Sequence, residues 1–198
     1  MSVGHYRTER LGSHSVIRID YRLPSGYLAI SPQLLFGSRT LYFPKTGFKP
    51  IALQQKEARL RTLFEKGRSL HQMGELGPAR DVYQSILNEA PAHFDAMHLL
   101  GVVCAQSGEH SLALDLFSRA IAINSRDPVT HNNLGNARAA LRDWTGAVQS
   151  YEQAIKLDFQ YALAYFNRGI AQEELGHLEL ALGSYQKAIH IDPTYVQA

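Results

Sequence analysis

The most constraining feature of the sequence is a repetition with a period of 34 residues. Three kinds of position recur at this offset: a glycine, an alanine and an aromatic residue. The glycines are Gly67, Gly101, Gly135 and Gly169, the alanines Ala79, Ala113, Ala147 and Ala181, and the aromatic residues Tyr83, Phe117, Tyr151 and Tyr185. A fixed period of this length indicates one small structural unit that is built four times and buries its apolar side against the next copy.

Each copy has the pattern of two amphipathic helices. In the third copy, apolar residues recur at helical spacing over residues 134–141 and again over residues 147–155. Asp143 lies between the two series and is a typical N-cap for the second helix. Helices of about a dozen residues are marginal in water by themselves, so each pair must be held by packing against its neighbours.

A helix-turn-helix unit repeated every 34 residues, with these glycines, alanines and aromatic residues, resembles the tetratricopeptide repeat (TPR) family over roughly residues 57–198. The resemblance implies an all-α fold, a right-handed superhelical solenoid of four TPR helix-turn-helix repeats. We place the TPR domain at residues 51–198 and its repeats at about 60–93, 94–127, 128–161 and 162–195. In this family the first helix of each repeat lines a concave groove.

The recurring residues predict how each hairpin packs. Glycine inside a helix costs about 0.8–1.0 kcal/mol relative to alanine, so each repeat glycine needs a packing reason. We expect the glycines to face the repeat alanines of the partner helix, which would let the two helices approach closely. The aromatic residues are then expected to fill the wider gap toward the next repeat. The single cysteine, Cys104, is expected to be a buried thiol.

Residues 1–50 differ from the rest in charge. They carry seven Lys and Arg against two acidic residues, whereas the remainder carries thirteen against sixteen. We expect an irregular, poorly ordered basic segment, with a possible strand pair at residues 16–23 and 27–30 around a turn at 24–26. One interpretation is a basic arm for an acidic partner or nucleic acid, and the favoured one is a poorly ordered, unselected extension. A mis-assigned start is a further alternative. The charges are scattered, so no nucleic-acid partner is expected.

The sequence offers no recognisable active site. It contains no GxSxG, GxGxxG or phosphate-binding GxxxxGK[ST] motif, and His93 and His98 are five residues apart with no further ligands arranged around them. We therefore predict a protein that is not an enzyme and holds no cofactor and no metal. There is no apolar run long enough to span a bilayer and no signal-like start, so we expect a cytoplasmic protein without a membrane partner.

What remains is a binding surface. The TPR resemblance places asparagines of the third and fourth repeats in the groove, and an amide can both donate to and accept from a peptide backbone. The predicted peptide-binding residues are Asn132, Asn133, Asn136 and Asn167. Phe64 and Arg68 occupy the positions where some TPR domains hold a C-terminal carboxylate with Lys and Asn, so that mode of binding is not expected. The leading hypothesis is a non-enzymatic scaffold that binds a protein or peptide partner.

Two alternatives stay open. The amino-acid sequence of residues 93–102 and 131–137 looks like that of the TPR array in bacterial SPINDLY-like proteins, which are akin to O-linked N-acetylglucosaminyltransferases. That resemblance implies an arm presenting substrates to a glycosyltransferase domain missing from these residues. In addition, the fourth repeat offers Leu178, Leu182, Tyr185 and Ile189 with no further helix in the sequence to cover them. We expect either a fragment of a longer protein or self-association through this repeat.

Overall fold

The computed structural model describes the backbone of residues 5–11 and 14–20 and both backbone and side chains of residues 51–194. The chain divides into two compact units, residues 1–47 and 48–198. The described strands belong to the first unit and the helices to the second.

In the first unit, β1 (His5–Leu11) and β2 (His14–Asp20) form an antiparallel hairpin in which His5 pairs with Asp20 and Leu11 with His14. Instead of being irregular, this part of the N-terminal segment therefore has secondary structure. The predicted strand at 16–23 overlaps β2, but its partner precedes it in the sequence. Gly12-Ser13 between the strands is a sequence that favours a two-residue hairpin connection. The predicted turn and second strand, residues 24–30, lie outside the described residues.

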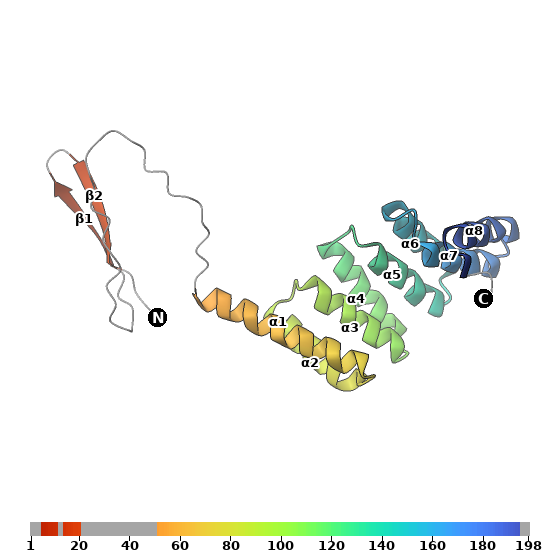
Figure 1. The fold of residues 1–198 in the computed structure, drawn as a ribbon, viewed down its shortest axis with the longest axis horizontal. Coiled ribbons are helices and arrows are strands. Elements are labelled where there is room, and N and C mark those ends of the chain that lie inside the picture. Colours follow the sequence, from red (N-terminus) through yellow and green to blue (C-terminus); the bar gives the residue numbers. More distant parts are fainter. Residues whose placement is uncertain (1–4, 12–13, 21–50, 195–198) are drawn as a thin grey trace. The chain divides into compact units, whose positions relative to one another are not determined.

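Within residues 51–194, the second unit contains eight helices in four consecutive antiparallel hairpins (Figure 1). The first helices of the hairpins are α1 (Ile51–Gln72), α3 (Phe94–Gln106), α5 (Pro128–Ala140) and α7 (Ala162–Glu174). The second helices are α2 (Leu76–Glu89), α4 (His110–Ile123), α6 (Trp144–Leu157) and α8 (Leu178–Ile191). This arrangement confirms the predicted all-α solenoid.

Local signals explain where the helices begin and turn. Asp127 and Asp143 are N-caps whose carboxylates accept from the backbone amides of Thr130 and Gly146, as Asp-Pro and Asp-Trp predicted. The turn inside a hairpin requires a left-handed residue, and this is a glycine in three repeats. In the third repeat Arg142 takes that position with a φ of 61°.

Inside each hairpin, the repeat glycine of the first helix lies under the aromatic ring of the second helix. A Cβ placed on Gly101 would lie 2.7 Å from the ring of Phe117, and one on Gly169 would lie 2.5 Å from Tyr185. Gly67 with Tyr83 and Gly135 with Tyr151 make the same contact. The prediction that the glycines face the alanines was wrong: the nearest neighbour is the ring, because the aromatic residue folds back onto its own hairpin.

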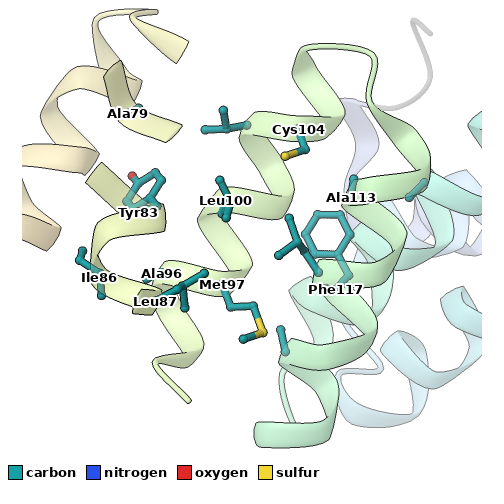
Figure 2. Close-up of a cluster of buried hydrophobic side chains, with 14 of the residues drawn as sticks. Ala79, Tyr83, Ile86, Leu87, Ala96, Met97, Leu100, Cys104, Ala113 and Phe117 are labelled. Atoms are coloured by element: carbon teal, nitrogen blue, oxygen red, sulfur yellow. The ribbon is translucent and has the colours of Figure 1, made fainter. Parts of the chain in front are cut away.

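The repeat alanines belong to the buried core. Ala79 and Ala113 are fully buried, and so is Cys104. Figure 2 shows the side chains of α2, α3 and α4 meeting in one continuous apolar layer, with Met97 and Leu100 of α3 among them. The core is therefore shared between successive hairpins, as short helices require.

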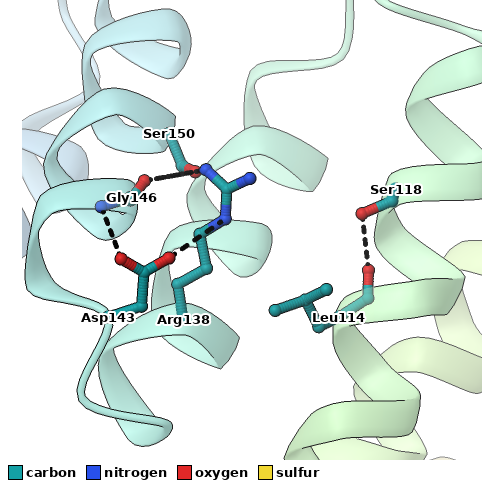
Figure 3. Close-up of polar contacts among 6 residues, drawn as sticks. All are labelled: Leu114, Ser118, Arg138, Asp143, Gly146 and Ser150. Atoms are coloured by element: carbon teal, nitrogen blue, oxygen red, sulfur yellow. Dashed lines mark hydrogen bonds and ion pairs between the residues drawn. The ribbon is translucent and has the colours of Figure 1, made fainter.

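A polar bridge also joins the two helices of the third hairpin (Figure 3). Arg138 Nη1 of α5 donates to the carbonyl oxygen of Gly146 and to Ser150 Oγ, both at 2.9 Å. In the fourth hairpin Ser184 stands 34 residues after Ser150, and its hydroxyl donates to Gln172 at 2.6 Å. These bridges satisfy buried hydroxyls and fix how the first helix is rotated against the second.

The first helices lie on the inner side of the array. Successive helices contact each other throughout, and in addition α3 contacts α5 and α5 contacts α7. Among the described helices, no pair of second helices makes contact to that extent. Because the first helices approach one another more closely than the second helices do, the stack curves toward its first helices. The sides of the first helices that face away from the second helices therefore form the inner face.

The last hairpin leaves apolar side chains exposed. Leu178, Leu180 and Leu182 of α8 are 66%, 59% and 58% exposed. Tyr185 and Ile189 are half-buried. Nothing in residues 51–194 covers these leucines, and self-association through this face stays a prediction.

The ring-on-glycine contact is testable by adding a single methyl group. We expect Gly101→Ala to lower the free energy of unfolding by roughly 1–2 kcal/mol, because overpacking outweighs the higher helix propensity of alanine. Gly183 in α8 is the matched control, since no atom lies within 4 Å of a Cβ placed there. Gly183→Ala should stabilise the protein by up to about 1 kcal/mol. Urea denaturation followed by circular dichroism measures both; equal effects would contradict the contact.

Candidate functional site

A shallow depression lies on the inner side, between α1 and α3. Its volume is about 340 Å³, and its lining residues are Phe64, Arg68, Asp95, His98 and Leu99. A second depression beside it shares Phe64 and Asp95 and reaches Arg61. Both are open, so they suit a surface-bound chain better than an enclosed small molecule.

Arg61 and the residues lining the first depression occupy four positions relative to the repeat glycine: six, three and two residues before it, and one after it. The second depression is lined in addition by Glu57, Leu60 and His93, which lie outside these positions. We call the residues at these positions in all four repeats the groove face. The 34-residue repetition extends it from α1 and α3 to α5 and α7. In the third repeat it comprises Val129, Asn132, Asn133 and Asn136, and in the fourth Leu163, Phe166, Asn167 and Ile170. All four predicted asparagines therefore belong to one face.

At the position three residues before the glycine, contacts between aromatic rings connect the groove face to the core. The ring centroids of Phe64 and Tyr83 lie 6.2 Å apart, and those of Phe166 and Tyr185 lie 5.7 Å apart. The third repeat has Asn132 here, which is only 1% exposed. An amide thus takes the place of a ring at this one position.

The asparagines form a hydrogen-bonded cluster across the boundary between the third and fourth repeats. Asn167 Nδ2 of α7 donates to Asn132 Oδ1 and to Asn136 Oδ1 of α5, both at 3.1 Å. The hydroxyl of Tyr151, on α6, donates to the same Asn136 Oδ1 at 2.9 Å. Burial raises the pKa of the Tyr151 phenol, so it remains a donor at neutral pH. We call Asn132, Asn136, Asn167 and Tyr151 the amide cluster.

The amide cluster determines which polar groups are left for a ligand. Asn136 Oδ1 accepts two hydrogen bonds, and Asn167 Nδ2 uses both of its hydrogens. Within residues 51–194, Asn136 Nδ2 and Asn167 Oδ1 therefore remain as a donor and an acceptor on neighbouring helices. A donor and an acceptor side by side match the C=O and N–H groups of a peptide backbone.

The four predicted asparagines have different places in this arrangement. Asn136 is exposed and Asn167 is half-buried. Asn132 is buried, so its amide supports Asn167 instead of facing a partner, and its Nδ2 has no hydrogen-bond partner in the described residues. Asn133 is half-buried, and its side chain makes no hydrogen bond within residues 51–194. Tyr151 was missed as part of the site, because the repeat pattern marks it only as a core aromatic.

The described residues hold no recognisable site of two other kinds. They contain no group of three or more His, Cys, Asp or Glu side chains placed to hold a metal ion. None of the helices in that part of the chain has the length and apolar character needed to cross a bilayer.

Family models match most of the helical region. Models described as "Tetratricopeptide repeat" match residues 64–128 and 162–195, and one described as "TPR repeat" matches residues 135–176. The chain belongs to the tetratricopeptide repeat family. The predicted resemblance is confirmed, and the glycine, alanine and aromatic positions are those of TPR units.

Curated TPR relatives match a short part of the chain. Tetratricopeptide repeat protein 17 of Homo sapiens is 38% identical over 72 residues, and that of Mus musculus is 37% identical over 72 residues. The matches cover 35% of this chain and 6% of each relative. The chain thus corresponds to a small fraction of these proteins.

Solved TPR structures match over more of the chain. MamA from Desulfovibrio magneticus RS-1 has a TM-score of 0.65 and 20% identity, with 68% of this chain and 76% of that chain covered. YrrB, described as a TPR protein with an unusual peptide-binding site, has a TM-score of 0.63 and 23% identity, with 72% and 73% covered. An O-GlcNAc transferase mutant from Thermobaculum terrenum has a TM-score of 0.56 and 26% identity, with 59% and 22% covered. MamA and YrrB show a shared fold.

A second polar link between TPR units involves His98. Its Nδ1 lies 2.7 Å from Thr130 Oγ1, and the Thr130 hydroxyl donates to Asp127 Oδ2 at 2.5 Å. A hydroxyl has one hydrogen, so the Thr130 oxygen must accept from His98 Nδ1–H. Nε2 of the neutral ring is then an acceptor. Burial lowers the pKa of His98, although Asp127 and Asp95 oppose this shift.

The lowered pKa of His98 has a definite effect on stability. As the pH falls, His98 of the unfolded chain takes up a proton near pH 6.5, whereas His98 of the folded protein takes one up only at a lower pH. The stabilisation from neutral His98 is therefore complete above that pH and is lost as the pH falls toward the lower pKa of the folded state. His98→Asn is the matched variant, because the equivalent residue of the next TPR unit is Asn132 and an amide can still donate to Thr130.

We expect wild-type protein to lose more free energy of unfolding than His98→Asn between about pH 7.5 and about pH 5.5. Urea denaturation at the two pH values measures this difference. Equal losses in the two proteins would show that His98 does not contribute to the pH dependence.

Proposed function

We propose that the groove face binds an extended peptide segment of a partner protein and that the chain acts as a non-enzymatic interaction module. The observation that supports this proposal is a pair of groups in the amide cluster, Asn136 Nδ2 and Asn167 Oδ1. Neither has a hydrogen-bond partner in the described residues. The cluster holds these groups in place before a ligand arrives, which reduces the entropy lost on binding.

Backbone recognition accounts for the choice of amides over charged side chains. A peptide backbone offers one donor and one acceptor per residue, whatever the side chain. An amide pair satisfies both without paying for the desolvation of a charge. The likeness to YrrB, a TPR protein described as having a peptide-binding site, supports the same class of partner.

The proposal predicts that Asn136→Asp weakens peptide binding without loss of fold. Aspartate keeps the acceptor used by Tyr151 and Asn167, but it replaces the free donor by an oxygen that repels a peptide carbonyl. We expect roughly a tenfold or greater rise in Kd. The probe is a peptide selected on wild-type protein from a displayed library of short random sequences, and the measurement is calorimetry.

The matched control is Asn88→Asp on α2, a second helix. Asn88 is exposed, and its Oδ1 accepts from Gln84, so this variant makes the same charge change and also keeps its acceptor. It should bind as wild type does. If both variants bind the selected peptide like wild type, the amide cluster is not the binding site.

A second candidate function is the substrate-presenting arm of an O-linked N-acetylglucosaminyltransferase-like glycosyltransferase. The observation favouring it is the 26% identity to the Thermobaculum terrenum O-GlcNAc transferase mutant, of which 22% is covered. This candidate requires a native product well above 22.1 kDa that transfers N-acetylglucosamine. Immunoprecipitation from the source cells and intact mass measurement test it, and a native product of 22.1 kDa would contradict it.

A further inference from the structure

The two halves of the groove face differ in charge. On α1 and α3, four of its positions hold ionisable carboxylates or guanidinium groups: Arg61, Glu65, Arg68 and Asp95. On α5 and α7, the same positions hold four asparagines and four apolar residues, and none is charged. The repeat pattern places these residues equivalently, so the difference lies in the side chains and not in the backbone.

Three of the four apolar residues of the α5–α7 half are exposed, and Phe166 is half-buried. Val129 is 42% exposed, Leu163 37% and Ile170 39%. Leu163 and Ile170 lie four residues before and three after Asn167, so all three share one side of α7. The amide cluster is thus flanked by apolar surface along the helix.

The charged side chains adjoining this half are mostly engaged within their own repeats. Arg168 Nε donates to Ser184 Oγ, and its guanidinium stacks on Tyr165 at 5.3 Å. Glu173 accepts from the Tyr185 hydroxyl at 2.7 Å. Arg138 donates to Gly146 and Ser150 in the third hairpin.

We propose that the α5–α7 half of the groove face selects an uncharged, apolar segment of the bound peptide. This inference rests on the proposed peptide-binding function and names the chemistry of the segment. In an extended chain, alternate side chains point the same way, so a segment with aliphatic or aromatic residues at alternate positions can contact Leu163 and Ile170. Its backbone meanwhile bonds to Asn136 and Asn167.

A charged side chain is rejected at this half for a physical reason. Binding would strip water from the charge, and the described groove positions of α5 and α7 offer no opposite charge to replace that water. Binding of an apolar side chain carries no such cost of desolvating a charge, and the transfer of its surface out of water is favourable. The α1–α3 half carries both signs of charge, so this selection applies to one half of the bound peptide.

The test uses the whole chain and a displayed library of short random peptides. We expect the selected peptides to share an uncharged stretch with Val, Leu, Ile, Met or Phe at alternate positions. Leu163→Lys and Ile170→Lys should each raise the Kd of such a peptide by roughly tenfold or more, because they place a charge against an apolar side chain. For a selected peptide without charged residues, raising the salt concentration should change the wild-type Kd by less than about twofold, since such a peptide forms no ion pair with the groove face.

Leu112→Lys is the matched control. Leu112 lies on α4 outside the groove face and is 39% exposed, as Ile170 is. This variant should bind like wild type, and circular dichroism checks that all three variants are folded.

The outcomes separate this inference from the peptide-binding proposal. A selected consensus that lacks an uncharged apolar stretch, or unchanged binding by Leu163→Lys and Ile170→Lys, overturns the inference. Peptide binding itself stands in that case if Asn136→Asp still weakens it. If wild-type protein selects no peptide, both the proposed function and the inference are overturned.

Discussion

The structure depends on one contact that is made four times, an aromatic ring of the second helix seated on a glycine of the first. The ring needs the glycine because a Cβ at that place would overlap it. Burying a ring of this size offsets the cost of a glycine inside a helix. The contact fixes how closely the two helices approach and how the first helix is rotated. The positions of the groove face are counted from the same glycine, so the packing contact also orients the groove face.

The repeats differ in whether the aromatic residue carries a hydroxyl group and in what that hydroxyl contacts. Tyr151 donates to Asn136, and Tyr185 donates to Glu173. Burial and this bond raise the pKa of Tyr185 to about 12, so it too remains a donor at neutral pH. The second repeat has Phe117 with no hydroxyl, and the first leaves the Tyr83 hydroxyl buried without a partner in the described residues. Only the third repeat uses its ring to position a groove amide.

The sequence predicted the architecture more completely than the site. Four hairpins, the N-caps at Asp127 and Asp143 and the long first helix from Ile51 follow from period, apolar spacing and cap chemistry, which are local signals. The partner of each repeat glycine was assigned wrongly, because the choice between an alanine and a ring depends on how the second helix is rotated. The strand pairing of residues 5–20 was also missed, although Gly12-Ser13 carries the signal.

The sequence by itself determined that the chain folds as a TPR solenoid and that its asparagines share one face, because both follow from a 34-residue period and a helical spacing. It did not determine which amide atoms face outward. Only the tertiary structure decided that Asn132 is buried and that Asn136 and Asn167 keep a free donor and a free acceptor. The reason is physical: those hydrogen bonds join α5, α6 and α7, and partners on different helices are set by packing and not by spacing along one helix.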